Sequence, residues 1–253
     1  MADAALARRA LRLLDLTDLA EDTTAQATRA LCARSLAAPG PVAAICVWPR
    51  FVVAARQALP AGPVAIATVV NFPAGGAERP PVLAAIETAL ADGADEIDLV
   101  LPWRALLAGD EASARAMVAE AKAQCGPHRL KVILESGDLP DQAAVRRAAR
   151  LAIAAGADFI KTSTGKSGSV ATPEAARTML EEIRASGRPV GLKPSGGLRT
   201  LADAACYLEL ADALMGPGWA SPVTFRFGAS GLHGVLVAAI GTAAPPTGDH
   251  GAY

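Results

Sequence analysis

The chain has 253 residues, enough for one (β/α)8 barrel or for two smaller domains, and its 52% hydrophobic content can fill a large core. The formal net charge of -1 argues against nucleic acid as the main partner, because the basic surface that such a partner requires is missing. Since no apolar run of about 18 residues occurs, and the N-terminus lacks an apolar block with a cleavage site, we expect neither a membrane span nor a signal peptide.

The two ends of the chain differ in composition from its centre. The start, MADAALARRALRLLDLTDLAEDTT, mixes charged and apolar residues in an amphipathic pattern, which predicts one or two helices outside the main fold over about residues 1–36. The end, TAAPPTGDHGAY, is rich in Pro and Gly, so we expect a short flexible tail over residues 242–253. No linker divides the remainder, which predicts a single domain over residues 1–253.

Eight short aliphatic runs are typical of strands. They lie at 42–47, 64–70, 96–101, 130–135, 159–163, 190–193, 213–215 and 225–229. Helical patterns such as PPVLAAIETALADG and EASARAMVAEAKAQCG separate most of these runs, and this alternation indicates a parallel sheet. Eight such strands predict an α/β fold of the TIM-barrel type. The segment between the last two strands, GPGWASPVT, contains no clear helix.

A sequence pattern made of an Ala-rich helix, Gly-Ala-Asp and a strand occurs twice, and a weaker version of it lies at 204–216. Its two glycines, Gly93 and Gly156, are 63 residues apart, which fits two βα units of about 31 residues each. We expect each glycine to end its helix with a left-handed backbone.

Three charged residues stand within the predicted strands. Side chains alternate along a strand, and if Ile97 and Leu99 face the helices, then Asp98 faces the barrel axis. The same phase in FIKTS and VGLKPS directs Lys161 and Lys193 inward, near the C-terminal strand ends where barrel active sites lie.

Each of these residues also has a purely structural interpretation. Asp98 can neutralise a buried lysine, Lys193 can reach solvent, and Lys161 can bind an anion. Burying all three costs several kcal/mol per ion unless pairing or function compensates, so their coincidence favours a reactive site. A lysine beside a second cation has its pKa lowered towards ~7–8, and its neutral amine can form a Schiff base with a carbonyl group. Asp98 can then shuttle the protons.

Three Gly-rich segments follow the late strands, at 164–168, 195–197 and 228–231. The last precedes an apolar helix, GLHGVLVAAIG, and backbone N–H groups at a helix N-terminus bind phosphate well. We therefore expect a phosphate site; the alternative is that these glycines only make tight turns.

The four cysteines and three histidines are scattered, with no CxxC pair and no other metal-ligand spacing. We therefore expect no metal site. Free thiols suit a reducing compartment, so we expect a cytoplasmic protein.

Several of these strings together resemble the deoxyribose-phosphate aldolase family, from about residue 10 to 240. They are GADFIKTSTGK, GLKPSGGLRT, GADEIDLVLPWRAL, ICVWPRF, ATVVNFP, RFGAS and LLDLTDL. The resemblance implies a class I aldolase that reversibly cleaves 2-deoxy-D-ribose 5-phosphate to D-glyceraldehyde 3-phosphate and acetaldehyde in cytoplasmic deoxyribonucleoside catabolism. It implies no metal or organic cofactor, because the lysine is the electron sink. Many relatives are dimers, so a homodimer is one expectation.

The resemblance also assigns roles to residues. It makes Lys161 the Schiff-base lysine, Lys193 the residue that perturbs its pKa, and Asp98 the proton donor and acceptor. The phosphate is expected among Gly165, Lys166, Gly196, Gly197, Gly228 and Ser230. Some relatives end in a tyrosine that helps move the enamine proton, so Tyr253 has either that role or none. Gly231 stands where some relatives have a second serine, which predicts weaker phosphate affinity at most.

Two other functions stay open at this point. One is a different Schiff-base barrel enzyme, such as a transaldolase or another sugar-phosphate aldolase, which would prefer a ketone donor. Comparing acetaldehyde with dihydroxyacetone phosphate as donor distinguishes such an enzyme from a deoxyribose-phosphate aldolase. The other is a non-catalytic sugar-phosphate binding protein, against which the presence of Asp98, Lys161 and Lys193 counts.

Overall fold

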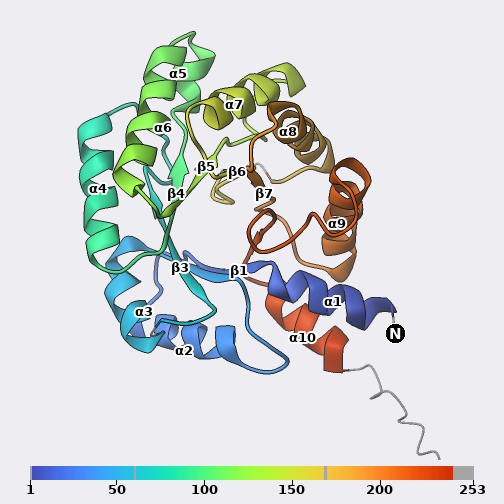
Figure 1. Ribbon diagram of the computed structural model, residues 1–253. Coiled ribbons are helices and arrows are strands. Elements are labelled where there is room, and N and C mark those ends of the chain that lie inside the picture. The colour runs from blue at the N-terminus through green and yellow to red at the C-terminus, as the bar shows by residue number, and fades with distance from the viewer. Residues whose placement is uncertain (1, 60, 168–169, 242–253) are drawn as a thin grey trace, which may run out of the picture.

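Eight parallel strands in the computed structural model form a barrel inside a ring of helices (Figure 1). The structure describes residues 2–59, 61–167 and 170–241. The strands are β1 (Leu14–Asp18), β2 (Ala44–Val47), β3 (Ala65–Val70), β4 (Glu96–Val100), β5 (Arg129–Ile133), β6 (Phe159–Lys161), β7 (Gly191–Lys193) and β8 (Phe227–Ala229). They pair in the order β7-β6-β5-β4-β3-β2-β1-β8, and two parallel bridges, Leu192–Phe225 and Ser195–Gly228, close the ring. The predicted (β/α)8 barrel is confirmed.

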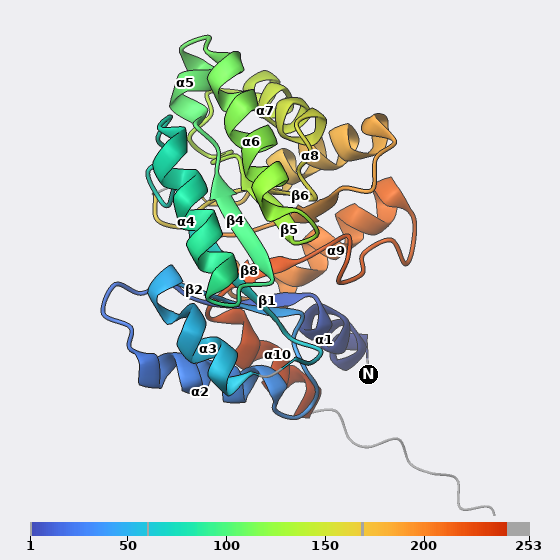
Figure 2. The same ribbon diagram turned by 60° about the vertical axis from the view of Figure 1, so that its left-hand side comes forward.

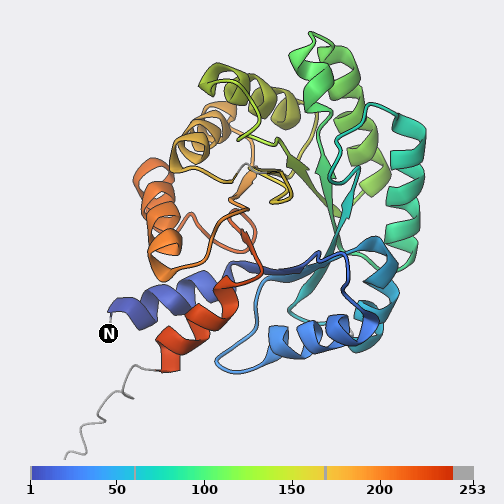
Figure 3. The ribbon, with the colours of Figure 1, turned by 180° about the vertical axis from the view of Figure 1, so that it is seen from behind.

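Helices cover the outside of every strand (Figure 2). In chain order they are α2 (Ala25–Leu36), the 3-10 turn η1 (Pro49–Phe51), α3 (Val52–Ala58), α4 (Arg79–Ala91), α5 (Trp103–Leu107), α6 (Glu111–Cys125), α7 (Gln142–Ala154), α8 (Pro173–Ser186), α9 (Leu201–Met215) and α10 (Leu232–Gly241). A further helix, α1 (Ala2–Arg12), precedes β1 and packs beside α10, as the view from behind also shows (Figure 3).

The strands are buried on both faces, as parallel strands beneath helices must be. Every residue of β2, β4, β6, β7 and β8 is buried. Ile97 and Leu99 of β4 belong to the apolar core, whereas Asp98 between them meets Lys161 and Lys193 inside the barrel. The predicted strand phase is therefore confirmed.

The prediction that residues 1–36 are helical and lie outside the barrel was wrong in one respect, because they contain β1. This strand pairs with both β2 and β8 and so joins the two ends of the sheet. Its sequence, LDLTD, has period two rather than helical spacing: Leu14 and Leu16 are fully buried, and Asp15 between them meets cations inside the barrel. Distant residues supply those cations, so the local sequence gave no reason to expect a buried aspartate.

The strand predicted at 213–215 was also wrong, because these residues form the last turn of α9. A capping box between Thr200 and Asp203 begins this helix, and Gly216, with φ of 96°, follows its end. Neither Gly nor Pro interrupts the segment between them, so the helix continues through it. The number of strands stays at eight because β1 takes the place of this one.

The repeated helix–glycine–strand pattern folds as expected. Gly93 and Gly156 have φ of 104° and 107°, and two βα units separate β4 from β6. The tail expected at residues 242–253 lies outside the described residues. In the part of the chain that the structure describes, no helix combines the length and apolar character needed to cross a membrane.

Gly191 allows β6 and β7 to meet inside the barrel. A Cβ atom at this position would lie 2.4 Å from the Phe159 ring, well inside van der Waals contact. We expect Gly191→Ala to lower the free energy of unfolding by about 1–3 kcal/mol, as overpacked cores do, in urea denaturation. Gly234→Ala is the control, since a Cβ there meets nothing within 4 Å and alanine favours the helix. Equal stability of the two variants would contradict this view of the packing.

Candidate active site

The centre of the site is Asp98, a fully buried carboxylate that binds three lysines. Its Oδ2 accepts hydrogen bonds from Lys161 Nζ at 2.9 Å and from Lys193 Nζ at 2.7 Å. Its Oδ1 accepts from Lys131 Nζ at 2.8 Å. Strand register produces this arrangement, because Asp98 pairs with Lys131 across β4 and β5, and Lys161 pairs with Lys193 across β6 and β7. The three residues predicted to be catalytic are thus in direct contact.

Further charged residues continue this group towards the N-terminal end of the barrel. Asp15 Oδ2 lies 2.6 Å from Lys193 Nζ as an ion pair, and its Oδ1 accepts from Arg226 Nη1 at 2.6 Å. Glu96 Oε2 lies 2.6 Å from Lys131 Nζ, and its Oε1 accepts from Arg226 Nη2 at 2.9 Å. We call the seven residues the interior charge cluster: Asp15, Glu96, Asp98, Lys131, Lys161, Lys193 and Arg226. None of the seven is more than 3% exposed.

The two lysines predicted to be catalytic have pKa shifts in opposite directions. Burial lowers the pKa of Lys161, with Asp98 opposing this effect and the charge of Lys193 reinforcing it. Burial also disfavours a charge on Lys193, but Asp15 and Asp98 outweigh it and raise the pKa of that lysine. Lys161 is therefore the amine that loses its proton more readily, while Lys193 stays a cation.

The interior charge cluster is electrically balanced when Lys161 is uncharged. Its three carboxylates then face Lys131, Lys193 and Arg226, whose pKa values are all raised because carboxylate contacts outweigh the effect of burial. Burial would raise the pKa of Asp98, but Lys131, Lys161 and Lys193 hold it well below the usual range. A proton on Lys161 would add an unmatched charge to an interior of low polarity, so the balance favours its free amine.

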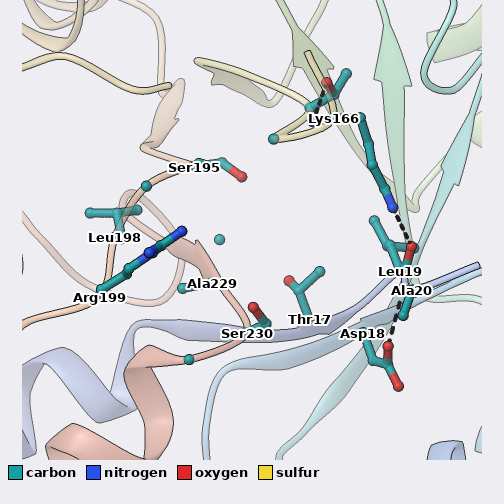
Figure 4. Close-up of a pocket in the computed structure, with 16 residues that line it drawn as sticks. Thr17, Asp18, Leu19, Ala20, Lys166, Ser195, Leu198, Arg199, Ala229 and Ser230 are labelled. Carbon is teal, nitrogen blue, oxygen red and sulfur yellow. Dashed lines mark hydrogen bonds between the residues drawn. The ribbon is translucent and has the colours of Figure 1, made fainter. Parts of the chain in front are cut away.

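A pocket of about 610 Å³ opens at the C-terminal ends of β1, β6, β7 and β8 (Figure 4). All the predicted substrate-binding residues line it: Gly165, Lys166, Gly196, Gly197, Gly228 and Ser230. Arg199 lines it as well, and Figure 4 shows Arg199 and Lys166 on opposite sides of the hollow with Ser230 between them. Two cations and a hydroxyl group around one hollow suit an anion.

Glycine is required in this wall for steric reasons too. Gly196 and Gly197 have φ of 90° and 79°, so the tight-turn interpretation of these residues also holds. A Cβ atom at Gly228 would lie 2.6 Å from Ser195 Oγ and 3.0 Å from Lys193 Cε. The absence of a side chain at Gly228 therefore lets the pocket wall approach Lys193, which connects the pocket with the interior charge cluster.

Two elements at the rim can contribute to anion binding. Ser230 and Gly231 directly precede α10, so the N-terminus of this helix lies at the pocket wall. Lys166 Nζ donates to the Leu19 carbonyl at 2.7 Å, across from the loops that follow β7 and β8 (Figure 4).

Sequence reasoning missed four charged residues of this site: Asp15, Lys131, Arg199 and Arg226. Lys131 had a usable signal, because the strand alternation that placed Asp98 inward also places Lys131 inward in RLKVI. Arg199 had one as well, since only Leu198 separates it from the Gly-rich segment 195–197. Asp15 and Arg226 had none, because their partners (each other, Lys193 and Glu96) come from distant parts of the chain. Tyr253, the remaining candidate, lies outside the described residues. Among those residues, no three His, Cys, Asp or Glu side chains gather into a metal-binding group.

Comparison with known proteins identifies the family. The model of the DeoC/LacD family aldolases matches residues 9–231. The chain belongs to this family. A deoxyribose-phosphate aldolase of Agrobacterium fabrum (strain C58 / ATCC 33970) is 54% identical to it over 224 residues, which cover 88% of this chain and 86% of the relative. The chain is therefore an enzyme, an aldehyde-lyase of the deoxyribose-phosphate aldolase type.

Solved structures agree with this membership. A 1.37 Å crystal structure from Toxoplasma gondii ME49, assigned to the deoxyribose-phosphate aldolases, has a TM-score of 0.88 and 28% identity, with 96% of this chain and 98% of that chain covered. A structure from Coccidioides immitis with the same assignment has a TM-score of 0.80 and 25% identity, with 91% and 85% covered.

We expect Lys193→Met to raise the pKa of Lys161, because the loss of a neighbouring cation removes a repulsion that disfavours its charge. Cyanate modifies neutral amines, so the pH midpoint of its reaction at Lys161, followed by peptide mass mapping, should rise by about one unit. Lys122, which Asp158 holds outside the barrel, is the internal control and should be modified to the same extent in the parent and the variant. A fall in the Lys161 midpoint would contradict the charge argument.

Proposed function

We propose that this aldolase reversibly cleaves 2-deoxy-D-ribose 5-phosphate to D-glyceraldehyde 3-phosphate and acetaldehyde through a Schiff base on Lys161. The observation that carries the proposal is the sharing of one carboxylate oxygen, Asp98 Oδ2, by Lys161 and Lys193 at 2.9 and 2.7 Å. This contact provides a reactive amine, a permanent cation and a proton-transfer group within one hydrogen-bonded unit.

Schiff-base formation begins at the C1 aldehyde of the sugar. The neutral Lys161 amine attacks C1, the carbonyl oxygen takes a proton, and a carbinolamine forms. This intermediate loses water to give a protonated imine. Asp98, within hydrogen-bond distance of Lys161, moves the required protons between nitrogen and oxygen, directly or through water. Lys193 keeps the surroundings cationic, so that Lys161 starts each cycle uncharged.

Carbon–carbon cleavage then breaks the bond between C2 and C3. A base removes the proton of the C3 hydroxyl, the bonding electron pair moves into the imine to give an enamine, and C3 leaves as the aldehyde carbon of glyceraldehyde 3-phosphate. The enamine takes a proton at C2, and water releases acetaldehyde and free Lys161. The positively charged imine nitrogen is the electron sink. The proton-carrying groups are Asp98, which contacts this lysine, and Lys193, which shares the Asp98 carboxylate.

The phosphate group lies in the pocket above the lysines. Gly165, Gly196, Gly197 and Gly228 leave room for it, and Lys166, Ser230 and the N-terminus of α10 bind it. Arg199 is added to this set because it lines the same hollow and offers a fork of N–H donors. Binding the phosphate at the strand ends directs C1 downward, towards the interior charge cluster.

The cellular role follows from this chemistry. An enzyme that splits deoxyribose 5-phosphate acts in deoxyribonucleoside catabolism, and we assign it to the cytoplasm. Free thiols at Cys32, Cys46, Cys125 and Cys206 support a reducing compartment. We also propose a homodimer, on the grounds of family resemblance.

Trapping with borohydride tests the proposed mechanism. Reduction in the presence of acetaldehyde should leave a stable adduct on Lys161, located by peptide mass mapping, because borohydride reduces an imine to an amine. Lys161→Arg should abolish the adduct and the turnover while its circular dichroism stays that of the parent. No adduct, or one confined to Lys193 or Lys166, would overturn the mechanism, and efficient use of dihydroxyacetone phosphate as donor would overturn the substrate.

The phosphate assignment has its own test. We expect Arg199→Gln to raise the KM for 2-deoxy-D-ribose 5-phosphate about tenfold, because a charge-assisted hydrogen bond to the substrate is lost. The kcat/KM for unphosphorylated 2-deoxyribose should stay unchanged. Arg177→Gln, on the exposed face of α8, is the matched control and should alter neither constant. Equal losses on both sugars would remove Arg199 from the phosphate site.

A further inference from the structure

Arg226 is a buried arginine that lies apart from the pocket. It is 3% exposed and stands just before β8, where its backbone N–H donates to the Leu192 carbonyl at 3.0 Å. Its guanidinium donates to Asp15 at 2.6 Å, to Glu96 at 2.9 Å and to the Pro222 carbonyl at 2.5 Å. The three nitrogens thus have acceptors within the protein, and Arg226 is not among the residues that line the 610 Å³ pocket. A role in binding substrate does not explain it.

The two carboxylates that Arg226 binds both lead to the lysines. Asp15 contacts Arg226 through one oxygen and Lys193 through the other, each at 2.6 Å. Glu96 contacts Arg226 and also lies 2.6 Å from Lys131, which in turn donates to Asp98 at 2.8 Å. Each path from Arg226 to Lys161 therefore consists of alternating positive and negative groups in direct contact.

We propose that Arg226 is a positioning residue for the Schiff-base lysine: its fixed charge, acting through Asp15 and Glu96, balances the interior charge cluster and leaves Lys161 uncharged. The inference rests on the proposed function, since it concerns the reactivity of that amine. Without Arg226, three carboxylates would face Lys131 and Lys193 inside the barrel, with Arg129 contacting Glu96 from the partly exposed rim. The surplus negative charge would attract a proton to Lys161 and remove the nucleophile.

An arginine suits this position better than a fourth lysine. The guanidinium does not lose its proton in proteins, so its charge is the same at every pH at which the enzyme can work. Its planar fork also contacts two carboxylates from different strands at once, Asp15 of β1 and Glu96 of β4. A buried lysine can release its proton, and the balance would then change with pH.

Whether Arg226 influences the charge of the Lys161 amine depends on which titratable and charged groups face each of these two residues. Around Lys161 they are Asp98 from β4, Lys193 from β7 and Cys46 from β2. Burial raises the pKa of the Cys46 thiol, so it stays neutral. Around Arg226 they are Asp15 and Glu96. Arg129 reaches Glu96 from the lower rim, where 28% of its side chain is exposed and water screens its charge.

The test uses two substitutions with opposite effects on the balance. Arg226→Met removes a positive charge, and Glu96→Gln removes a negative one with little change of shape. The readout is the pH midpoint of borohydride-trapped acetaldehyde adduct at Lys161 in the full-length enzyme. We expect the midpoint to rise by about one pH unit in Arg226→Met and to fall in Glu96→Gln. The KM for the phosphorylated sugar should stay within about twofold of the parent in both, because neither residue lines the pocket.

Two further variants keep the test decisive. Arg9→Met removes an arginine from an outer ion pair, with Asp212, and should leave the midpoint unchanged. Arg129→Gln removes a positive charge that contacts Glu96 at the partly exposed rim. It should raise the Lys161 midpoint by less than Arg226→Met does. If Arg226→Met does not fold, Glu96→Gln and Arg129→Gln decide, since they must still shift the midpoint in opposite directions.

The outcomes separate this inference from the function on which it rests. Opposite shifts support it. Unchanged midpoints, or shifts in the same direction, overturn it and leave Arg226 a structural residue. Absence of a trapped adduct in the parent enzyme would overturn the Schiff-base proposal itself.

Discussion

The carboxylate of Asp98 is the contact on which the rest of the site depends. It binds three lysine amines in the middle of a barrel that excludes water, and neither the lysines nor the carboxylate could be buried there alone. The barrel meets this requirement through strand register, which pairs Asp98 with Lys131 in one row and Lys161 with Lys193 in the row two residues nearer the C-terminal ends of the strands. Because the group is complete within the protein, its amines need no solvent, and one of them can remain unprotonated beside its neighbours.

The groups of the site are arranged in levels along the barrel axis. The pocket-lining residues lie mostly in loops at the C-terminal ends, where glycines with positive φ create space. The lysines lie below, and beneath them the arginine and two carboxylates complete the interior charge cluster. Gly228 links the upper two levels, since any side chain there would collide with Lys193. Away from Gly228, the loops can change without disturbing the buried charges.

Much of this organisation could be predicted from the sequence. Strand alternation was enough to place Asp98, Lys161 and Lys193 together, and the Gly-rich strings pointed to the pocket. The errors had physical causes. A two-residue period in LDLTD was hidden by charged neighbours that looked helical, and 213–215 lacked a break that would end α9. Asp15 and Arg226 could not be found, because a buried charge is intelligible only once its partner in space is known, and these partners are 211 residues apart.

The same separation in sequence ties the site to the order of folding. β1 enters the sheet first along the chain, yet its aspartate gains an arginine only when the segment before β8 arrives. Contacts between such distant residues form late, because a long loop must close before they yield any stabilisation. Until then Asp15 has Lys193 as its partner but lacks the second cation that balances it in the finished barrel. Closure of the ring therefore completes the charge balance of the interior, so the charges around Lys161 depend on both ends of the chain being in place.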